Sequence, residues 1–364
     1  TKPSMKTRTE IYAWIEKELL EIEPQLSQAK AKKSTDAGYY RADKAAAWML
    51  LARLYLNAEV YTGTAQWAKA AEYAHKVMTS DYRLSTTATG QWSAYQKLFM
   101  GDNGETDAAY EGVFRIGQDG VKTTSWAGTC FLMGSTFDGD MHADVSGTYP
   151  QATNGTGQTW GGNRARKELL QKFFPNNDAP NISCTQMPAA ANDDRAIFDG
   201  IGRTLDNGDG SMGHFTDGYA VAKWNNFKTD GSVGHNDTYP DTDFFLFRVA
   251  EANLIYAEAT ARQNGGTTTA DGTAAINALR TRARALTKTG YSLNDICDEW
   301  SREFYFEGLR RPTLIRFGRF GGNNNYNWSY KGGAKNGRNF PASKNIFAIP
   351  ADQVKGALVQ NPGY

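Results

Sequence analysis

The 364-residue sequence is poor in the residues that build metal and redox centres, with only three cysteines and four histidines. Cys130, Cys184 and Cys297 are widely spaced and match no zinc or redox pattern. The histidines show no His-x-x-x-His spacing for zinc. We therefore expect buried free thiols, with a Cys130–Cys184 disulfide as the alternative.

Charge of one sign and long apolar runs are also missing. The 40 basic and 39 acidic residues leave a formal net charge of +1, which excludes a broad positive field for nucleic acid. No apolar run approaches the ~20 residues that span a bilayer. The chain opens without an initiator Met or an apolar signal segment, so we expect a processed or trimmed start.

Catalytic motifs are scarce. Residues 208–213 (GDGSMG) match G-x-G-x-x-G, but no clear strand precedes them, and Asp206 and Asp209 would repel phosphate. No G-x-S-x-G nucleophile motif occurs. A glycosidase needs two carboxylates ~5 to 9.5 Å apart, and nothing in the sequence singles out such a pair. The motifs therefore indicate no particular enzyme class, and a helical glycoside hydrolase stays open as an alternative.

Helical periodicity is strong at the N-terminal end of the chain. Residues 9–26 carry an apolar stripe at helical spacing, and Pro24 predicts a stop or a kink. Residues 41–61 and 65–78 follow as two helices around a short turn. Their small alanines would let the helices approach closely, a pattern typical of a tetratricopeptide (TPR) unit.

A second group of helices is predicted near the C-terminal end. It comprises residues 244–264, residues 273–286 and a helix that starts at Ser292, which can form a capping box with Asp295. We therefore predict a mainly α fold in a single domain, residues 1–364. Its parts are TPR-like helices (1–84), a loop-rich binding region (85–243) and C-terminal helices (244–364).

The middle region holds glycine and polar residues alternating with isolated aromatic rings. The whole chain has 9 Trp, 18 Tyr, 18 Phe and 37 Gly, more glycine than helix packing uses. Within the region, residues 110–116 indicate a strand and residues 166–174 a helix. Because disordered segments are poor in aromatic residues, we interpret 85–243 as ordered binding loops.

Four motifs in the last third of the chain resemble the SusD-like (SusD/RagB) family. They are FFLFRVAEANLIYAEA from Phe244, AAINALRTRARA from Ala274, EWSREFYFEGLRRPTLIRFG from Glu299 and IFAIPADQVKGALVQNPGY from Ile346. Family members are glycan-binding lipoproteins on the surface of Bacteroidetes. Two positions depart from the family pattern, because Trp300 stands at a usual Arg and Thr313 at a usual Asp.

The resemblance implies what the protein does and where. It implies non-catalytic binding of oligosaccharide or polysaccharide and delivery to a SusC-type TonB-dependent transporter. It also implies an outer-membrane, cell-surface location through an N-terminal lipid anchor that this chain lacks. Residues 117–140 resemble the starch-binding branch, which suggests a starch-like α-glucan. A TPR-type scaffold for protein partners is a further alternative.

Sugar binding requires exposed aromatic platforms, because rigid rings lose little entropy when they stack on sugar faces. The family's platform positions correspond here to Trp126 and Trp160. Tyr149 and Phe137 are further candidate platforms. For each ring, the alternative is that it anchors its loop to the core.

Polar candidates lie beside these rings and in an earlier loop. Asn163 and Arg164, next to Trp160, are candidates for hydrogen bonds to sugar hydroxyls. Calcium is the one cofactor that the residues suggest. Its candidate ligands are Asp102, Asn103 and Asp107, completed by Asp243 as in some relatives. The alternative is a solvated turn.

The stretch from Asp298 to Gly318 combines arginines, acids and aromatic rings. We predict that Arg310, Arg311 and Arg316 pair with Glu303 and Glu307 and hold the last helix on its neighbours. The alternative is a site for a carboxylate ligand.

Overall fold

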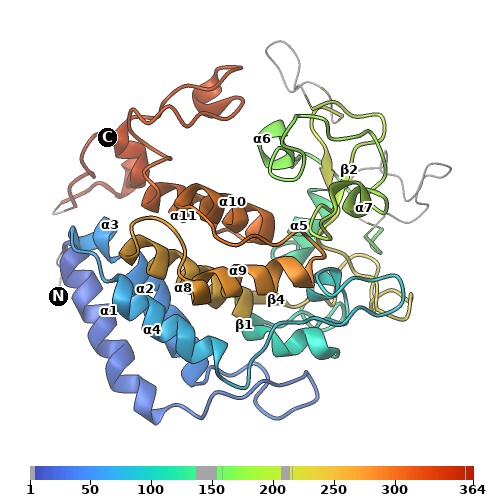
Figure 1. The fold of residues 1–364 in the computed structure, drawn as a ribbon, viewed down its shortest axis with the longest axis horizontal. Coiled ribbons are helices and arrows are strands. Elements are labelled where there is room, and N and C mark those ends of the chain that lie inside the picture. The colour runs from blue at the N-terminus through green and yellow to red at the C-terminus, as the bar shows by residue number, and fades with distance from the viewer. Residues whose placement is uncertain (1–4, 137–153, 158, 206–213, 215, 357) are drawn as a thin grey trace.

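Helices from both ends of the chain pack together in the computed structural model, as predicted (Figure 1). The structure describes all residues except 1–4, 137–153, 158, 206–213, 215 and 357. The longer helices are α1 (Arg8–Ile22), α2 (Lys44–Leu56), α4 (Trp67–Met78), α8 (Val249–Gln263), α9 (Ala270–Arg282) and α10 (Leu293–Phe304). Helix α4 packs on α2 and α8, and α9 packs on α8. Among the described residues, no helix is long and apolar enough to span a membrane.

The N-terminal helices follow the predicted pattern with one break. Pro24 lies in the 3-10 turn Glu23–Gln25 that ends α1, which confirms the predicted stop. Asp43 caps α2, because its side chain accepts a hydrogen bond from the Ala45 amide. The expected helix over 41–61 divides at Asn57 into α2 and α3 (Ala58–Thr62). Fully buried alanines at the contacts of α2, α4 and α8 allow their close approach.

The prediction of a helix from residue 244 is wrong at its start. Residues Phe244–Arg248 form strand β4, which pairs antiparallel with the predicted strand, β1 (Gly112–Ile116). Burial alternates along β4, since Phe245 and Phe247 are buried while Leu246 is exposed. This period of two is that of a strand, and α8 begins only at Val249.

The C-terminal helices begin where the caps predict. Ser292 and Asp295 form the expected capping box at the start of α10. Helix α11 (Arg310–Arg316) follows, and α10 packs on both α8 and α11. After Arg316, the described residues contain short 3-10 turns and no further α-helix.

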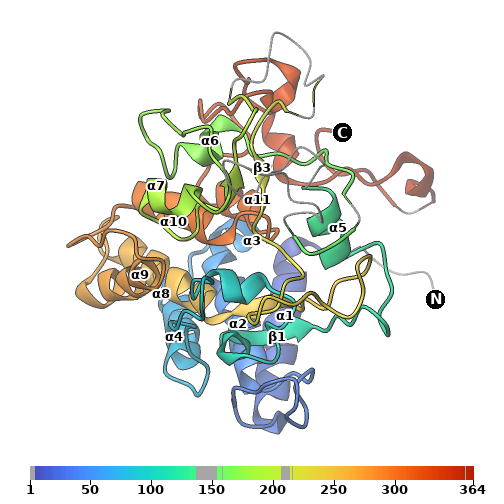
Figure 2. The ribbon, with the colours of Figure 1, turned by 90° about the vertical axis from the view of Figure 1, so that its right-hand side faces the viewer.

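The middle region is ordered by short elements and its own small cores. Its short elements are α5 (Thr129–Gly134), α6 (Lys167–Leu170), α7 (Met187–Ala191), β2 (Phe198–Asp199) and β3 (Ala220–Val221). One apolar cluster surrounds Phe99 and Trp224, and a second surrounds Phe173, Phe198 and Tyr305. The segment with α5, α6 and α7 lies to one side of the helical layer, as Figures 1 and 2 show. The helix expected over 166–174 is reduced to α6.

All three cysteines are free and buried, which confirms the prediction of free thiols. Burial raises the pKa of Cys184, so this thiol stays protonated at neutral pH.

A buried ionic network joins the middle region to the C-terminal helices, but through other arginines than predicted. Glu303 is fully buried and pairs with Arg195, Arg248 and Arg282. Glu307 pairs with Lys223 and Arg248. The predicted partners of these two acids were therefore wrong. Basic residues from the middle region, β4 and α9 form the ion pairs instead.

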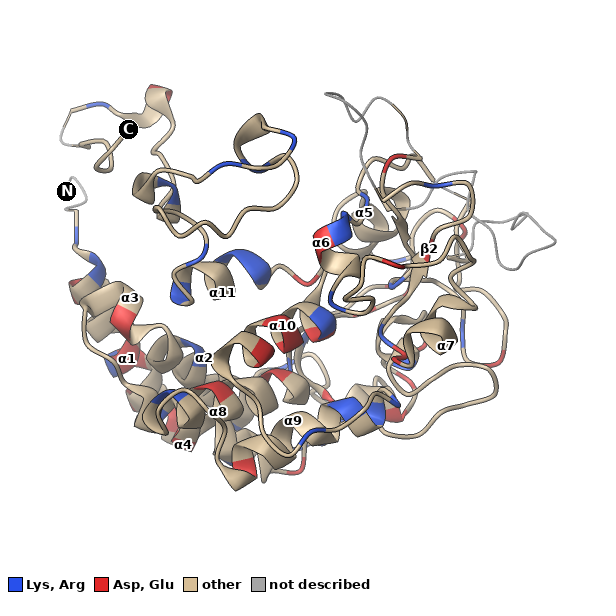
Figure 3. Ribbon diagram, turned by 45° about the horizontal axis from the view of Figure 1, so that its top comes forward, with Lys and Arg blue, Asp and Glu red and all other residues tan. Residues whose placement is uncertain are grey.

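Arg316 instead pairs with buried Glu258 on α8, at 2.6 Å. Trp300, at the position where the family pattern has Arg, donates its indole N–H to the same carboxylate at 2.9 Å. The indole thus replaces a guanidinium as a donor to Glu258. Helix α11 carries basic and no acidic residues, as Figure 3 shows.

Candidate functional site

Trp126 and Trp160, which the sequence placed in separate loops, lie side by side. Trp126 lies between β1 and α5, and Trp160 lies beyond α5 along the chain. Their ring centroids are 6.1 Å apart at an interplanar angle of 60°. The residues are 55% and 39% exposed. Both rings therefore present surface to solvent, which a core anchor would not.

The C-terminal end of α5 holds Trp160 in place. The backbone amides of Trp160 and Gly161 donate to the Gly134 carbonyl oxygen at 3.0 and 3.1 Å. A Cβ atom at Gly134 would lie 2.3 Å from the Trp160 indole. The ring therefore lies directly on the helix end, and only glycine permits this approach.

Tyr239 is a third ring at this site, which the sequence analysis missed. Its centroid lies 5.3 Å from that of Trp126, with an interplanar angle of 66°. The available signal was an aromatic residue before proline in a polar loop. We define Trp126, Trp160 and Tyr239 as the aromatic cluster.

Two aspartates fasten the Tyr239 loop to the loop that carries Trp126. Asp241 accepts a hydrogen bond from the Gly120 amide at 2.7 Å, and Asp243 accepts one from the Gln118 amide at 2.8 Å. A Cβ at Gly120 would lie 2.3 Å from the Tyr239 carbonyl oxygen, so the two backbones are in close contact. Backbone contacts between separate loops therefore position the cluster.

The predicted polar residues beside Trp160 make contacts within the protein. The Asn163 side chain donates to Ser135 Oγ at 3.0 Å, and the residue remains exposed. Arg164 donates to the His214 carbonyl oxygen. Both residues follow the cluster along the chain, and their contact with a sugar stays a prediction.

Phe137 and Tyr149 are the remaining candidate rings, and Trp224 is a further tryptophan of the middle region. Phe137 and Tyr149 lie outside the described residues. Trp224 is 2% exposed and stacks on Phe244 at 5.4 Å, so it is a core residue.

The four predicted calcium ligands direct most of their oxygens at protein donors. Both Asp243 oxygens accept hydrogen bonds, and Asn103 exchanges hydrogen bonds with the Asp243 backbone. Asp107 pairs with Lys97. Asp102 Oδ2 accepts from Thr229, while Asp102 Oδ1 is buried without a partner. One orphaned oxygen does not make a calcium site, so this arrangement does not fit the ion, and calcium binding here stays a prediction.

The ionised carboxylate of Asp243 is destabilised by its burial. Burial raises the pKa of its carboxyl group to about 6, although the Gln118 amide, the Tyr39 hydroxyl and the Arg115 charge act in the opposite direction. The ionised form of Asp243 is therefore disfavoured relative to that of an exposed aspartate, even with the Arg115 charge nearby.

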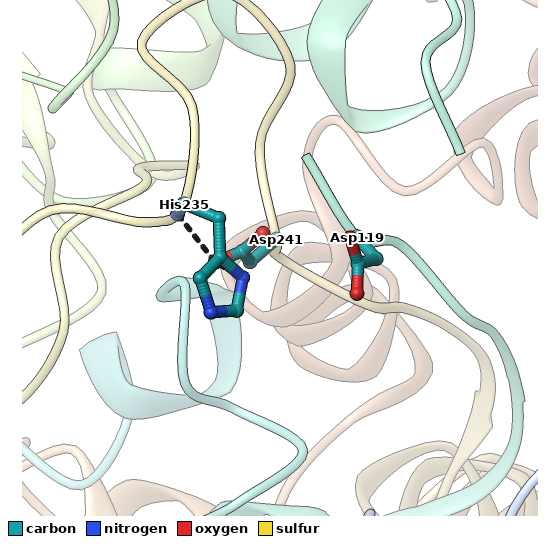
Figure 4. Close-up of side chains that lie close together, drawn as sticks. All are labelled: Asp119, His235 and Asp241. Carbon is teal, nitrogen blue, oxygen red and sulfur yellow. Dashed lines mark hydrogen bonds and ion pairs between the residues drawn. The ribbon is translucent and has the colours of Figure 1, made fainter. Parts of the chain in front are cut away.

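A different group of metal-ligand side chains lies beside the aromatic cluster. Asp119, His235 and Asp241 each bring one ligand atom within 4.8 Å of the others (Figure 4). His235 Nδ1 lies 3.0 Å from the Asp241 carboxylate. Asp119 also accepts hydrogen bonds from the amides of Lys122 and Val121, which lower its pKa. A mixed nitrogen and oxygen set suits zinc or manganese better than calcium.

Comparison with known proteins places these features in a family. The sequence profile of the SusD family matches residues 201–364. The starch-binding protein SusD of Bacteroides thetaiotaomicron is 40% identical over 396 residues, which include all of this chain and 67% of that protein.

Solved structures agree at the level of the fold. A SusD homolog from B. thetaiotaomicron has a TM-score of 0.64 at 18% identity, with 98% of this chain and 70% of that chain covered. Surface glycan-binding protein A of the same organism, solved with laminarihexaose, has a TM-score of 0.61 at 20% identity, with 97% and 70% covered. The helical scaffold, the ordered loops and the sequence identity agree, and the chain belongs to the SusD family.

Proposed function

We propose that this protein binds oligosaccharides at the aromatic cluster without cleaving them, and that its ligand is a starch-like α-glucan. The observation that carries the proposal is the pair of exposed rings, Trp126 and Trp160, with the half-buried Tyr239 beside Trp126. Because the rings are set at 60° and 66° to one another, their faces point in different directions, which suits a glucan chain that turns between successive units. The 40% identical relative that is named for starch binding supports this choice of glycan.

A titration with chemically distinct glycans tests the proposal. We expect maltoheptaose to bind more tightly than laminarihexaose or a xylogluco-oligosaccharide. Long incubation should release no reducing sugar, whereas a helical glycoside hydrolase would release it. Binding of laminarihexaose in preference to maltoheptaose would contradict the α-glucan assignment, and binding of none of the three would contradict the site.

The same titration, repeated with EDTA, tests for a cation. We infer that a divalent ion near Asp119, His235 and Asp241 would fix the Tyr239 loop. Weaker maltoheptaose binding in EDTA, restored by one added metal, would support this inference. Equal affinity with and without EDTA would contradict it.

We further propose that the protein works at the outer-membrane surface with a SusC-type TonB-dependent transporter. Membership of the family supports this partner. The net charge of +1 offers little long-range steering, so a stable complex needs a large interface. Co-purification with a large β-barrel in mild detergent tests it, and repeated recovery of the protein alone would contradict it.

Gly134→Ala should weaken glycan binding without unfolding the protein. The added methyl group would displace the Trp160 ring from its position beside Trp126. We expect an affinity loss of about fivefold, the cost of disturbing one stacking platform. Gly290→Ala is the matched control, because a Cβ there meets no atom within 4 Å. Equal affinity in both variants would show that the Trp160 position does not matter.

A further inference from the structure

A cavity of about 590 Å³ lies apart from the aromatic cluster. It is enclosed by α6, α10, α11 and the segment from Phe320 to Trp328. It shares no lining residue with the aromatic cluster or with the Asp119 group. Its volume lies within the range of small-molecule sites.

Aromatic rings form much of its wall. Phe306, Phe320, Tyr326 and Trp328 line the cavity, and all four are only half-buried. Phe306 has a φ of +58°, in the left-handed region that a bulky residue rarely adopts. Strain of this kind persists only when the surroundings hold it, and it is common at binding sites. The rings offer apolar faces to a ligand.

Three arginines line the same cavity, and each donates to neutral partners. Arg310 donates to the Cys297 carbonyl oxygen and to the Tyr326 hydroxyl, both at 2.8 Å. Arg311 donates to the Lys344 carbonyl oxygen at 2.8 Å.

Arg166 donates to the Ser329 carbonyl oxygen. Within the described part of the chain, none of the three arginines forms an ion pair. The cavity's fourth cation, Lys172, is already paired with Asp298 at 2.7 Å. Among the described residues, the one acid that lines the cavity is Glu168, whose Oε1 accepts hydrogen bonds from Ser329 and whose Oε2 is buried without a partner.

The contrast with the buried network is informative. Arg195, Arg248 and Arg282 each bond two or more carboxylates, as expected of arginines that serve the fold. Arg310 and Arg311 were predicted to pair with acids in the same way, and they do not. They keep guanidinium N–H groups and a net positive charge for a ligand.

Ser301 supplies an independent observation. It lines the cavity from α10, is 6% exposed, and its Oγ is buried with no hydrogen-bond partner among the described residues. An unsatisfied buried hydroxyl is costly unless a ligand completes it. Gln171 and Asn327 line the same cavity and add amide groups that suit sugar hydroxyls.

We propose that this cavity binds an acidic sugar, a uronic acid unit of an oligosaccharide. The carboxylate is held by Arg310 and Arg311, whose planar forks match its two oxygens. The sugar ring lies against the aromatic wall, and a hydroxyl completes Ser301 Oγ. The site goes beyond the proposed α-glucan binding, since neutral glucans carry no carboxylate.

Isothermal titration with trigalacturonate, and with maltotriose as its neutral counterpart, tests the proposal on the whole chain. We expect trigalacturonate to bind with a Kd near or below about 1 mM and more weakly as salt rises. Saturating maltoheptaose should not compete with it. Competition would mean that the acid binds at the aromatic cluster and would overturn the second site. Because maltoheptaose binding is measured separately, failure of either site is distinguishable from failure of the other.

Variants at Arg311 and Ser301 test whether trigalacturonate binds in this cavity. Arg311→Gln should weaken trigalacturonate binding by about tenfold, and Arg311→Lys by less, because the charge remains. Ser301→Ala should weaken it severalfold while leaving the melting temperature unchanged, since it removes a hydroxyl that bonds no group among the described residues. Arg41→Gln, at an exposed arginine outside the cavity, is the charge-matched control.

Three results would overturn the proposal. They are the absence of trigalacturonate binding, equal affinity for maltotriose, and unchanged affinity in both Arg311→Gln and Ser301→Ala. Benzoate distinguishes the sugar from any ring that bears a carboxylate. Binding of benzoate as tight as that of trigalacturonate would show that the sugar hydroxyls contribute nothing and would overturn the sugar assignment.

Discussion

Glu303→Gln should lower the free energy of unfolding by about 3 to 5 kcal/mol, which is the usual cost of removing one charged partner from a buried ion pair. Glu303 is fully buried and lies 3.2, 2.6 and 2.5 Å from nitrogens of Arg195, Arg248 and Arg282. Burial alone would raise the pKa of its carboxyl group, but these three guanidiniums lower it well below the ordinary value. A neutral amide of the same shape would remove the one carboxylate that all three guanidiniums share and leave excess positive charge inside the protein.

Urea denaturation measures this effect without the screening that guanidinium chloride introduces. The matched control is Glu21→Gln on α1, whose ion pair with Lys17 is 3.6 Å long with side chains 60% and 68% exposed. An exposed pair contributes about 0 to 1 kcal/mol, so the control should unfold close to the wild type. A Glu303→Gln protein with the same urea midpoint as the control would show that the network is not needed for stability.

The helical part of the fold could be predicted because its signals are local. Pro24, the Ser292 cap and the alanine-rich faces each act within a few residues. The strand at Phe244 was missed because its four apolar residues and Arg248 run directly into an apolar helix. Its conformation is decided by pairing with β1, more than a hundred residues away in sequence. A pairing at that distance leaves no local signature.

The partners of the buried ion pairs could likewise not be predicted from neighbouring residues in the sequence. Glu303 and Glu307 lie near Arg310 and Arg311 along the chain, which favoured pairing between neighbours. In the folded protein, Arg248 from the end of β4 is inserted between both acids instead. The residue types thus predicted that an ionic network exists. Which basic residue pairs with which acid depends on tertiary packing.

In the candidate site, too, single residues could be predicted from the sequence but their contacts could not. Trp126 and Trp160 stood out as single aromatic residues in polar loops, and the resemblance assigned them a role. Their contact with each other and with Tyr239 depends on how three loops are fastened together. The fastening is done by the backbone amides of Gln118 and Gly120, which donate to Asp243 and Asp241. Backbone donors carry no sequence signal.

Replacing Trp126 or Trp160 by alanine should weaken maltoheptaose binding by roughly 5- to 150-fold, equivalent to about 1 to 3 kcal/mol by analogy with base–aromatic stacking. The melting temperature should change little, because Trp126 and Trp160 are 55% and 39% exposed and neither belongs to a buried apolar cluster. Since the two rings contact each other, the losses should not add. We expect the double variant to lose less binding free energy than the sum of the single variants.

Two other tryptophans calibrate the measurement. Trp14 on α1 is 61% exposed, so Trp14→Ala should change neither affinity nor stability. Trp224 is 2% exposed, and Trp224→Ala should destabilise the fold by about 3 to 5 kcal/mol. If Trp126→Ala and Trp160→Ala behave like Trp224→Ala, with stability lost and glycan affinity kept, the rings anchor their loops and sugar binds elsewhere. If they behave like Trp14→Ala, the cluster has neither role. Only lost affinity with preserved stability identifies them as sugar platforms.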